Sequence, residues 1–159
     1  DRDDDTTWFS GEELIRQLRK IPARQVLVIA DSCYAGSLIR ERDPESPPKN
    51  EDERLKYLER MSGNPVRTYI ASGGKEPVLD EGGSGHSIFA SVLLKALAQP
   101  PHPSFTAAEL YQNHIVEAVV GRAEQTPVYA ILVKAFSNED FSTFGDFVFM
   151  KLPGQPETR

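Results

Sequence analysis

The spacing of hydrophobic residues changes along the chain and marks where helices and strands are expected. Near the start, apolar positions three and four residues apart predict an amphipathic helix over residues 11–21, with a capping box from Ser10 to Glu13 at its beginning. The apolar positions of this helix are Leu14, Ile15, Leu18 and Ile21. Residues 25–30, QVLVIA, form a continuous aliphatic run instead, which predicts a central parallel strand buried on both faces.

The same two patterns recur in the rest of the chain. The expected elements are strands over residues 66–72, 127–133 and 144–152 and helices over residues 87–98 and 106–120. The second of these helices begins with a capping box, Thr106 to Glu109. Because helices alternate with strands, we expect an α/β fold, with a mostly parallel sheet flanked by helices.

Residues 39–65 differ from their surroundings in composition. Prolines and charges of both signs are dense there, which predicts an exposed linker loop whose second half forms at most one short surface helix. The hydrophobic residues of that half are Leu55, Leu58 and Met61. The chain is therefore expected to hold one domain over residues 1–152, interrupted by this loop, and a frayed tail over residues 153–159.

Composition narrows the classes of function. The chain has 159 residues, 39% of them hydrophobic, which suffices for one domain with a single core. A formal net charge of -6 does not favour nucleic acid or an anionic membrane as a partner. The apolar runs are too short to span a membrane. A single cysteine cannot form an internal disulfide, so a reducing compartment such as the cytoplasm is expected.

That single cysteine, Cys33, follows the aliphatic run over residues 25–30 by three positions. Ligands of open α/β sheets gather at the carboxyl ends of the strands, and Gly36 permits a tight turn there. A cysteine at such an edge is either a nucleophile or a small buried residue without a chemical role. Its position alone leaves both interpretations open.

The segment Asp31-Ser32-Cys33-Tyr34-Ala35-Gly36 resembles the Asp-Ser-Cys-x-x-Gly nucleophile segment of metacaspases and bacterial caspase-like peptidases. Other segments resemble further parts of that family in the same order along the chain. They are Ser72-Gly73-Gly74-Lys75-Glu76-Pro77, Gly85-His86-Ser87-Ile88-Phe89, Gln125-Thr126-Pro127 and Gly145-Asp146-Phe147-Val148-Phe149. The resemblance covers most of the chain and implies a caspase-like (caspase-hemoglobinase) fold that is incomplete at its N-terminus.

The resemblance implies a cysteine endopeptidase that cleaves after Arg or Lys through a Cys-His dyad. Cys33 would be the nucleophile, and its backbone N–H would donate to the developing oxyanion. Asp31 would pair with the basic residue before the scissile bond, while Ser72 and Gly73 would pair with the backbone of the peptide or protein substrate. Without the resemblance, both assignments have a structural alternative. Asp31 could accept hydrogen bonds from loop amides at the end of the strand, and Ser72-Gly73 could be an ordinary turn from a strand into a loop.

The proton acceptor for Cys33 is not evident in the sequence. The family's histidine should lie about 50 residues before the cysteine, and no residue before Cys33 is a histidine. His86 directly precedes a predicted helix, and the N-terminus of a helix disfavours the imidazolium that a catalytic base must form. His102 is expected in a surface turn and His114 at a half-buried helical position, so neither is the expected base. Because the chain begins with Asp1 and not Met, we expect an N-terminal part of the same precursor to complete the sheet, supply the histidine and stay associated; a sequence that simply lacks this part would look the same.

Two alternatives to this protease remain open at the level of sequence. One is a caspase-like pseudoprotease that binds partners or acts as a scaffold without catalysis, and the other is an unrelated α/β binding domain with an inert cysteine. The linker loop over residues 39–65 is rich in Arg and Lys, so self-cleavage there would be consistent with a basic specificity. No carboxylate cluster has the spacing of a calcium loop, and no metal or other cofactor is expected.

Overall fold

A computed structural model of the chain describes residues 11–31, 40–41, 48, 50–73, 85–100, 102–122, 126–132 and 145–151. The helices are α1 (Gly11–Lys20), α2 (Glu51–Gly63), α3 (Ile88–Ala98), α4 (Ala107–Leu110) and α5 (Glu117–Val120), with a π-helical segment η3 (Tyr111–Val116) joining α4 to α5. The strands are β1 (Gln25–Ala30), β2 (Arg40–Glu41), β3 (Val66–Ala71), β4 (Ser104–Thr106), β5 (Val128–Ile131) and β6 (Val148–Met150).

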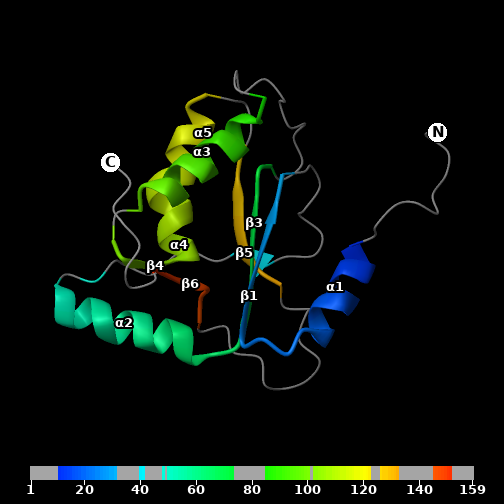
Figure 1. Cartoon of the computed structure of the whole chain (residues 1–159). Helices are drawn as coiled ribbons and strands as arrows, with labels where there is room; N and C mark the ends of the chain where they lie inside the picture. The colour runs from blue at the N-terminus through cyan, green and yellow to red at the C-terminus, as the bar shows by residue number, and fades with distance from the viewer. Residues whose placement is uncertain are drawn as a thin grey trace.

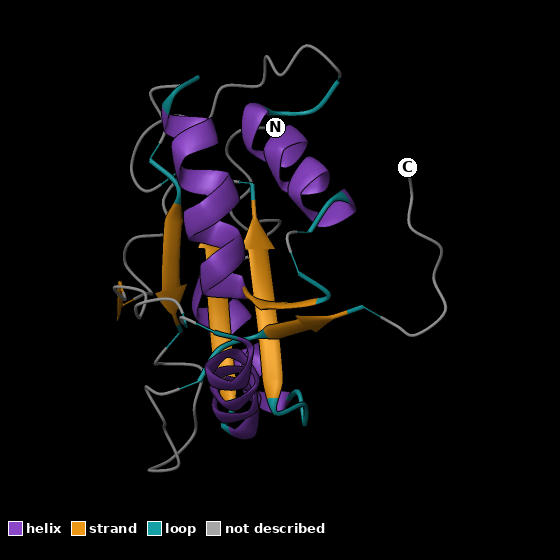
Figure 2. Cartoon of the chain, turned by 90° about the vertical axis from the view of Figure 1, so that its left-hand side faces the viewer, coloured by secondary structure: helices purple, strands orange, loops and turns teal. Residues whose placement is uncertain are grey.

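The elements form an α/β arrangement in layers, as expected. Helix α1 lies on one face of the main sheet, and α3 lies with α4 and α5 on the other face (Figure 1). Figure 2 looks at the second face, with these helices in front of the strands. The predicted helices and the strands over residues 25–30, 66–72 and 127–133 are confirmed within one or two residues at the ends that the structure describes. The strand expected over residues 144–152 is shorter, because it begins only at Val148 and ends at Met150.

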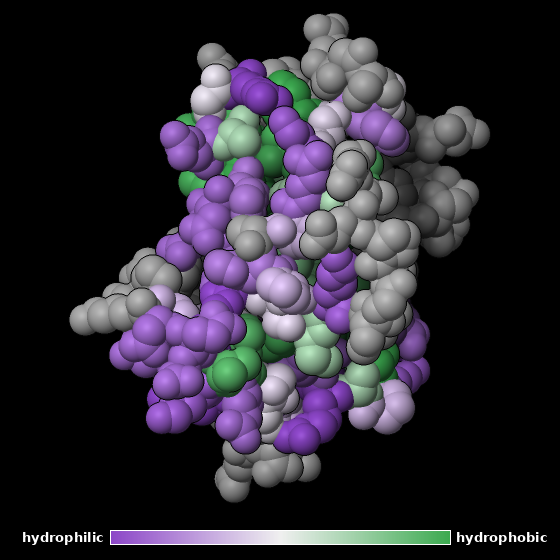
Figure 3. Space-filling view, turned by 60° about the vertical axis from the view of Figure 1, so that its left-hand side comes forward, coloured by the Kyte–Doolittle hydropathy of each residue, from purple (hydrophilic) through white to green (hydrophobic). Residues whose placement is uncertain are grey.

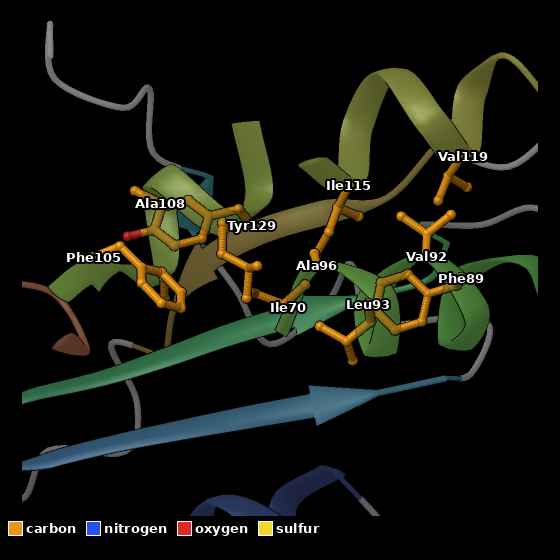
Figure 4. Packing of buried hydrophobic residues seen from close by; sticks show 12 residues of the cluster. Ile70, Phe89, Val92, Leu93, Ala96, Phe105, Ala108, Ile115, Val119 and Tyr129 are labelled. Atoms are coloured by element: carbon orange, nitrogen blue, oxygen red, sulfur yellow. The ribbon is translucent and has the colours of Figure 1, made fainter. Parts of the chain in front are cut away.

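Alternating side chains of the strands pack in two hydrophobic clusters, one on each face of the sheet. On the α3 side, Ile70 and Tyr129 pack against buried residues of α3, α4, η3 and α5 (Figure 4). On the α1 side, Tyr69 and Ala71 pack against Ile15 and Leu18. Because successive side chains of a strand point to opposite faces, β3 contributes to both clusters and all six of its residues are buried.

The main sheet has the order β1-β3-β5-β2, and it is mixed. Strands β1 and β3 are parallel, whereas β5 runs antiparallel to both β3 and β2. The expectation of a mostly parallel sheet is therefore wrong for the described strands. The reason lies in the connection: α3 crosses the face of the sheet in one direction and α4 to α5 crosses back, so the chain enters β5 at the end where β3 stopped (Figure 1).

Strand β1 is also not central in the described part of the chain. Both of its faces are covered, since Leu27 packs on the α3-side cluster while Val26, Val28 and Ala30 pack on the α1-side cluster. Among the described residues, however, β1 pairs with β3 alone, and Ile29 is 40% exposed. The aliphatic run predicted burial on both faces, but the residues of β1 are at most partly buried, and the run carries no information about whether a second neighbouring strand is present.

The second half of the predicted linker loop packs more closely than its composition suggests. Asn50 caps α2 by accepting a hydrogen bond from the backbone N–H of Glu53. Met61 is buried, and so is Arg54, whose guanidinium donates to a carboxylate oxygen of Glu109 at 2.6 Å and to the carbonyl of Ser104 at 2.5 Å. An ion pair therefore joins α2 to the first turn of α4, and residues 51–63 belong to the folded unit.

A second, two-stranded sheet of β4 and β6 was not expected as a unit. The sequence predicted a strand around β6 but none at β4. Strand β4 is only three residues long, and its last residue, Thr106, is also the first residue of the capping box. That box forms as predicted: the Thr106 side chain accepts from Glu109 N, and the Glu109 carboxylate accepts from Thr106 N. The rings of Phe105 and Phe149 stack between the two strands with centroids 4.8 Å apart, and both residues pack in the cluster on the α3 side, so the small sheet lies against the core.

Hydrophilic residues cover most of the described surface in Figure 3, and hydrophobic residues appear there in small separate groups. Single exposed apolar residues of this kind are normal on a folded domain. No helix in the described part of the chain is both long and apolar enough to cross a membrane.

Candidate functional site

The parallel pair β1–β3 brings two of the predicted site residues together at one end of the sheet. Ala30 and Ala71 are register partners at the ends of the two strands. One step further, the backbone N–H of Ser72 donates to the carbonyl of Ala30 at 3.0 Å. Asp31 and Ser72 therefore leave the sheet side by side, at the carboxyl edge where ligands of such sheets gather.

Asp31 is exposed and is held by a residue from a distant part of the chain. Its Oδ2 accepts a hydrogen bond from the hydroxyl of Ser87 at 2.5 Å. Ser87 is the N-cap of α3, and its Oγ accepts from the backbone N–H of Ala90 at 2.9 Å. The site thus consists of the ends of two strands and the N-terminus of a helix, an arrangement suited to ligands that bear both hydrogen-bond donors and acceptors.

Ser72 and Gly73, the predicted substrate-backbone residues, are both buried. The N–H of Ser72 is engaged with Ala30, so pairing with a substrate would have to use its carbonyl, its hydroxyl or the backbone of Gly73. The Ser72 hydroxyl is fully buried and has no hydrogen-bond partner among the residues that the structure describes. Because an unsatisfied buried polar group costs about 1–3 kcal/mol, a ligand that reached this oxygen would gain by bonding to it.

Cys33, the predicted nucleophile, lies outside the described residues, as do Ser32 and Gly36. Asp31 is described, so the strand that leads to Cys33 ends at the edge formed by Asp31 and Ser72.

The histidines downstream of Cys33 lie in different surroundings. His86 is exposed and directly precedes Ser87, and His102 is exposed in the turn before β4. His114 is half-buried on η3, in agreement with the sequence interpretation, and its Nε2 is buried with no hydrogen-bond partner in the described part of the chain. Of these, His86 is the one whose sequence neighbour contacts Asp31.

A second carboxylate, that of the buried Asp146, has a structural role that the sequence did not reveal. It is 1% exposed and accepts hydrogen bonds from the Thr68 hydroxyl at 3.1 Å, from Ala108 N at 2.8 Å and from its neighbour Phe147 N at 2.7 Å. Burial raises the pKa of this carboxyl, and the hydrogen bonds offset part of the increase. Its backbone carbonyl also accepts from the Gln25 amide at 2.7 Å, at the amino end of β1.

Asp146 is therefore separated from Asp31 by the length of β1, which is about 20 Å at 3.3 Å per residue. Perturbed pKa values often mark active sites, but structural networks perturb them too. Since Asp146 contacts β3, the start of α4 and β1, it serves to join these elements, and Asp31 remains the carboxylate at the candidate site.

Ser87 is the residue of the site whose role the sequence analysis missed. A serine before an apolar run is a signal for a helix cap, and this signal could have identified it as the N-cap of α3. Its bond to Asp31, 56 positions earlier, depends on the tertiary fold and has no local signal. Within the described part of the chain, no group of three or more His, Cys, Asp or Glu side chains could hold a metal ion.

Comparisons with known proteins found no matching family model, no similar curated protein and no similar solved structure.

Proposed function

We propose that the chain is part of a caspase-like cysteine endopeptidase of the cytoplasm that cleaves peptide bonds after Arg or Lys. The observation that carries the proposal is the meeting of Asp31, Ser72 and the N-terminus of α3 at the carboxyl edge of a parallel strand pair, two residues before Cys33. The resemblance of Asp31–Gly36 to the family's nucleophile segment also supports a caspase-like peptidase. A caspase-like fold is part of the proposal.

Asp31 supplies the preference for a basic residue in this proposal. Its carboxylate is exposed at the end of β1 and is held at one oxygen by Ser87. An oriented carboxylate at the edge of a site attracts a cation, and a guanidinium can bond to both of its oxygens at once.

Cys33 performs the chemistry. The thiolate sulfur bonds to the carbonyl carbon of the residue after which the chain is cut, and the carbonyl oxygen gains negative charge. The C–N bond then breaks, and the leaving amine takes the proton that the histidine removed from the thiol. Water hydrolyses the acyl-enzyme, which releases the new carboxyl end and restores the thiol. Backbone N–H groups near Cys33 stabilise the oxyanion in both steps.

The histidine of the dyad is supplied by an N-terminal segment of the same precursor. The outer edge of β1 supports this part of the proposal, since β1 pairs with β3 alone among the described residues. A strand added in parallel at this edge would end beside Asp31, because the carboxyl ends of parallel strands lie at the same edge of a sheet. A histidine directly after that strand would face the segment that carries Cys33.

An arginyl acyloxymethylketone tests the function, because it binds as a substrate and then alkylates a reactive thiol. We expect the native protein to be labelled at Cys33, as located by peptide mass spectrometry, and the isolated chain not to be labelled. Cys33→Ala should abolish labelling, and Asp31→Asn should slow it by about 100-fold if the lost charge-assisted pair is worth about 3 kcal/mol.

An uncharged norleucyl probe serves as the matched control. It should label the native protein slowly and equally in wild type and Asp31→Asn. A folded native protein that no probe labels would contradict the protease proposal and favour a pseudoprotease that binds without catalysis.

A further inference from the structure

Ser87 makes two hydrogen bonds that together fix the direction of its hydroxyl. Its oxygen accepts from the N–H of Ala90, and a serine hydroxyl has a single proton to donate. A carboxylate can only accept, so that proton points to Oδ2 of Asp31. The hydroxyl therefore links the first turn of α3 to the carboxylate of Asp31.

Ser87 is held in place by the packing around it. Ser87 is buried, and the next turn of α3 places Phe89, Val92 and Leu93 in the core on the α3 side of the sheet (Figure 4). Asp31, in contrast, is exposed and lies at the last step of a strand with one neighbour among the described residues. The rotation of its carboxylate is limited by Ser87 more than by packing.

We propose that Ser87 is a positioning residue for Asp31 and that it gives the site a preference for arginine over lysine. This inference rests on the proposed function. A carboxylate has about four lone-pair positions, so the bond from Ser87 uses one position on Oδ2 and leaves both oxygens able to accept from a guanidinium. The bond sets the plane of the carboxylate.

The two basic side chains respond differently to that plane. Guanidinium is planar and bonds to a carboxylate through two parallel N–H groups, so a fixed carboxylate plane favours it. The ammonium of lysine is a compact charge with rotatable donors and tolerates a turned carboxylate. Loss of the Ser87 hydroxyl should therefore weaken arginine recognition more than lysine recognition.

Ser87→Gly separates this role from helix capping, because glycine at an N-cap destabilises a helix only slightly relative to serine. In the native protein we expect kcat/KM for an arginyl peptide to fall about tenfold, and that for the matched lysyl peptide to fall no more than about threefold. Tenfold corresponds to about 1.4 kcal/mol. Ser87→Thr keeps a hydroxyl and should restore the wild-type ratio.

Asn50→Ala is the matched control, since it removes the N-cap of a different helix, α2, where the Asn50 side chain accepts from the backbone N–H of Glu53. It should leave the ratio of arginyl to lysyl kcat/KM unchanged. Binding of agmatine, a free guanidinium ligand, provides a readout without catalysis: its Kd should rise about tenfold in Ser87→Gly.

The outcomes distinguish the inference from the function on which it rests. A wild-type protein that cleaves arginyl peptides, together with a Ser87→Gly variant of unchanged ratio and unchanged agmatine Kd, overturns the role of Ser87 alone. A properly folded wild-type protein that neither cleaves basic peptides nor binds agmatine overturns both. A ratio that falls in Ser87→Gly and recovers in Ser87→Thr supports both.

Discussion

The buried carboxyl of Asp146 gives a prediction about stability that can be worked out from its contacts. Its oxygens accept from two backbone N–H groups, those of Ala108 and Phe147, and from the hydroxyl of Thr68. Asp146→Ala removes the acceptors and leaves these donors without partners. At about 1–3 kcal/mol for each unsatisfied buried group, the two backbone amides alone should cost about 2–6 kcal/mol. That is a large part of the 5–15 kcal/mol by which a domain is usually stable.

Asp146→Asn is the more informative change, because it keeps the size of the side chain and removes its titration. Burial raises the pKa of Asp146 in the folded protein above its value in the unfolded chain. Between the two pKa values the folded state binds more protons than the unfolded state, so stability falls as the pH rises through this window. The contribution of Asp146 is therefore fully present below the unfolded pKa, near 3.9, and is lost as the pH rises through the folded pKa.

Urea denaturation of wild type and Asp146→Asn across pH 4 to 8 tests this reasoning. We expect wild type to be more stable than the variant throughout the acidic range, with a free-energy difference that shrinks as the pH rises. Asn64→Ala, which removes a surface amide that bonds to the Arg60 carbonyl, serves as a control with no pH-dependent difference. A difference between wild type and Asp146→Asn that grows with pH would show that the hydrogen bonds outweigh burial and would refute the assigned direction.

Two further predictions concern the other carboxylate contacts. Arg54→Ala should destabilise the protein by about 3–5 kcal/mol, since it leaves Glu109 largely buried without its cation. A double-mutant cycle with Glu109→Ala, followed by thermal unfolding, should show that Arg54→Ala costs much less in the Glu109→Ala background than in wild type; strictly additive losses would contradict the pairing. Asp31→Asn should lower kcat/KM for arginyl peptides about 100-fold while changing Tm little, because Asp31 is exposed. A matched fall for norleucyl peptides would argue against a role in specificity.

Local features of this chain were predictable from sequence because their causes are local. Apolar spacing identified α1, and the aliphatic run identified β1, each within about one residue of its bounds. The capping box of Thr106 and Glu109 formed as predicted, since both of its hydrogen bonds join residues three positions apart.

The features that escaped prediction depend on distant partners. Arg54 lies in a charged, helical segment that looks fully solvated, yet it is buried because Glu109, 55 positions later, neutralises it. The reversal of β5 depends on two passes of helix over the sheet, and apolar spacing does not reveal which way each pass runs. At the candidate site, the family resemblance singled out Asp31 and Ser72, whereas the partner of Asp31 became visible only once α3 was placed against β1.

The contacts of Asp146 also bear on the order in which the domain can fold during synthesis. Its partners precede it in the chain by 38 positions at Ala108, 78 at Thr68 and 121 at Gln25. All three leave the ribosome well before Asp146 does, so β1, β3 and the start of α4 wait with unsatisfied polar groups until the segment 145–151 emerges. Nascent chains that stop short of this segment should therefore be open to proteases and chaperones, and the fold should close as one unit only after residues 145–151 have left the ribosome.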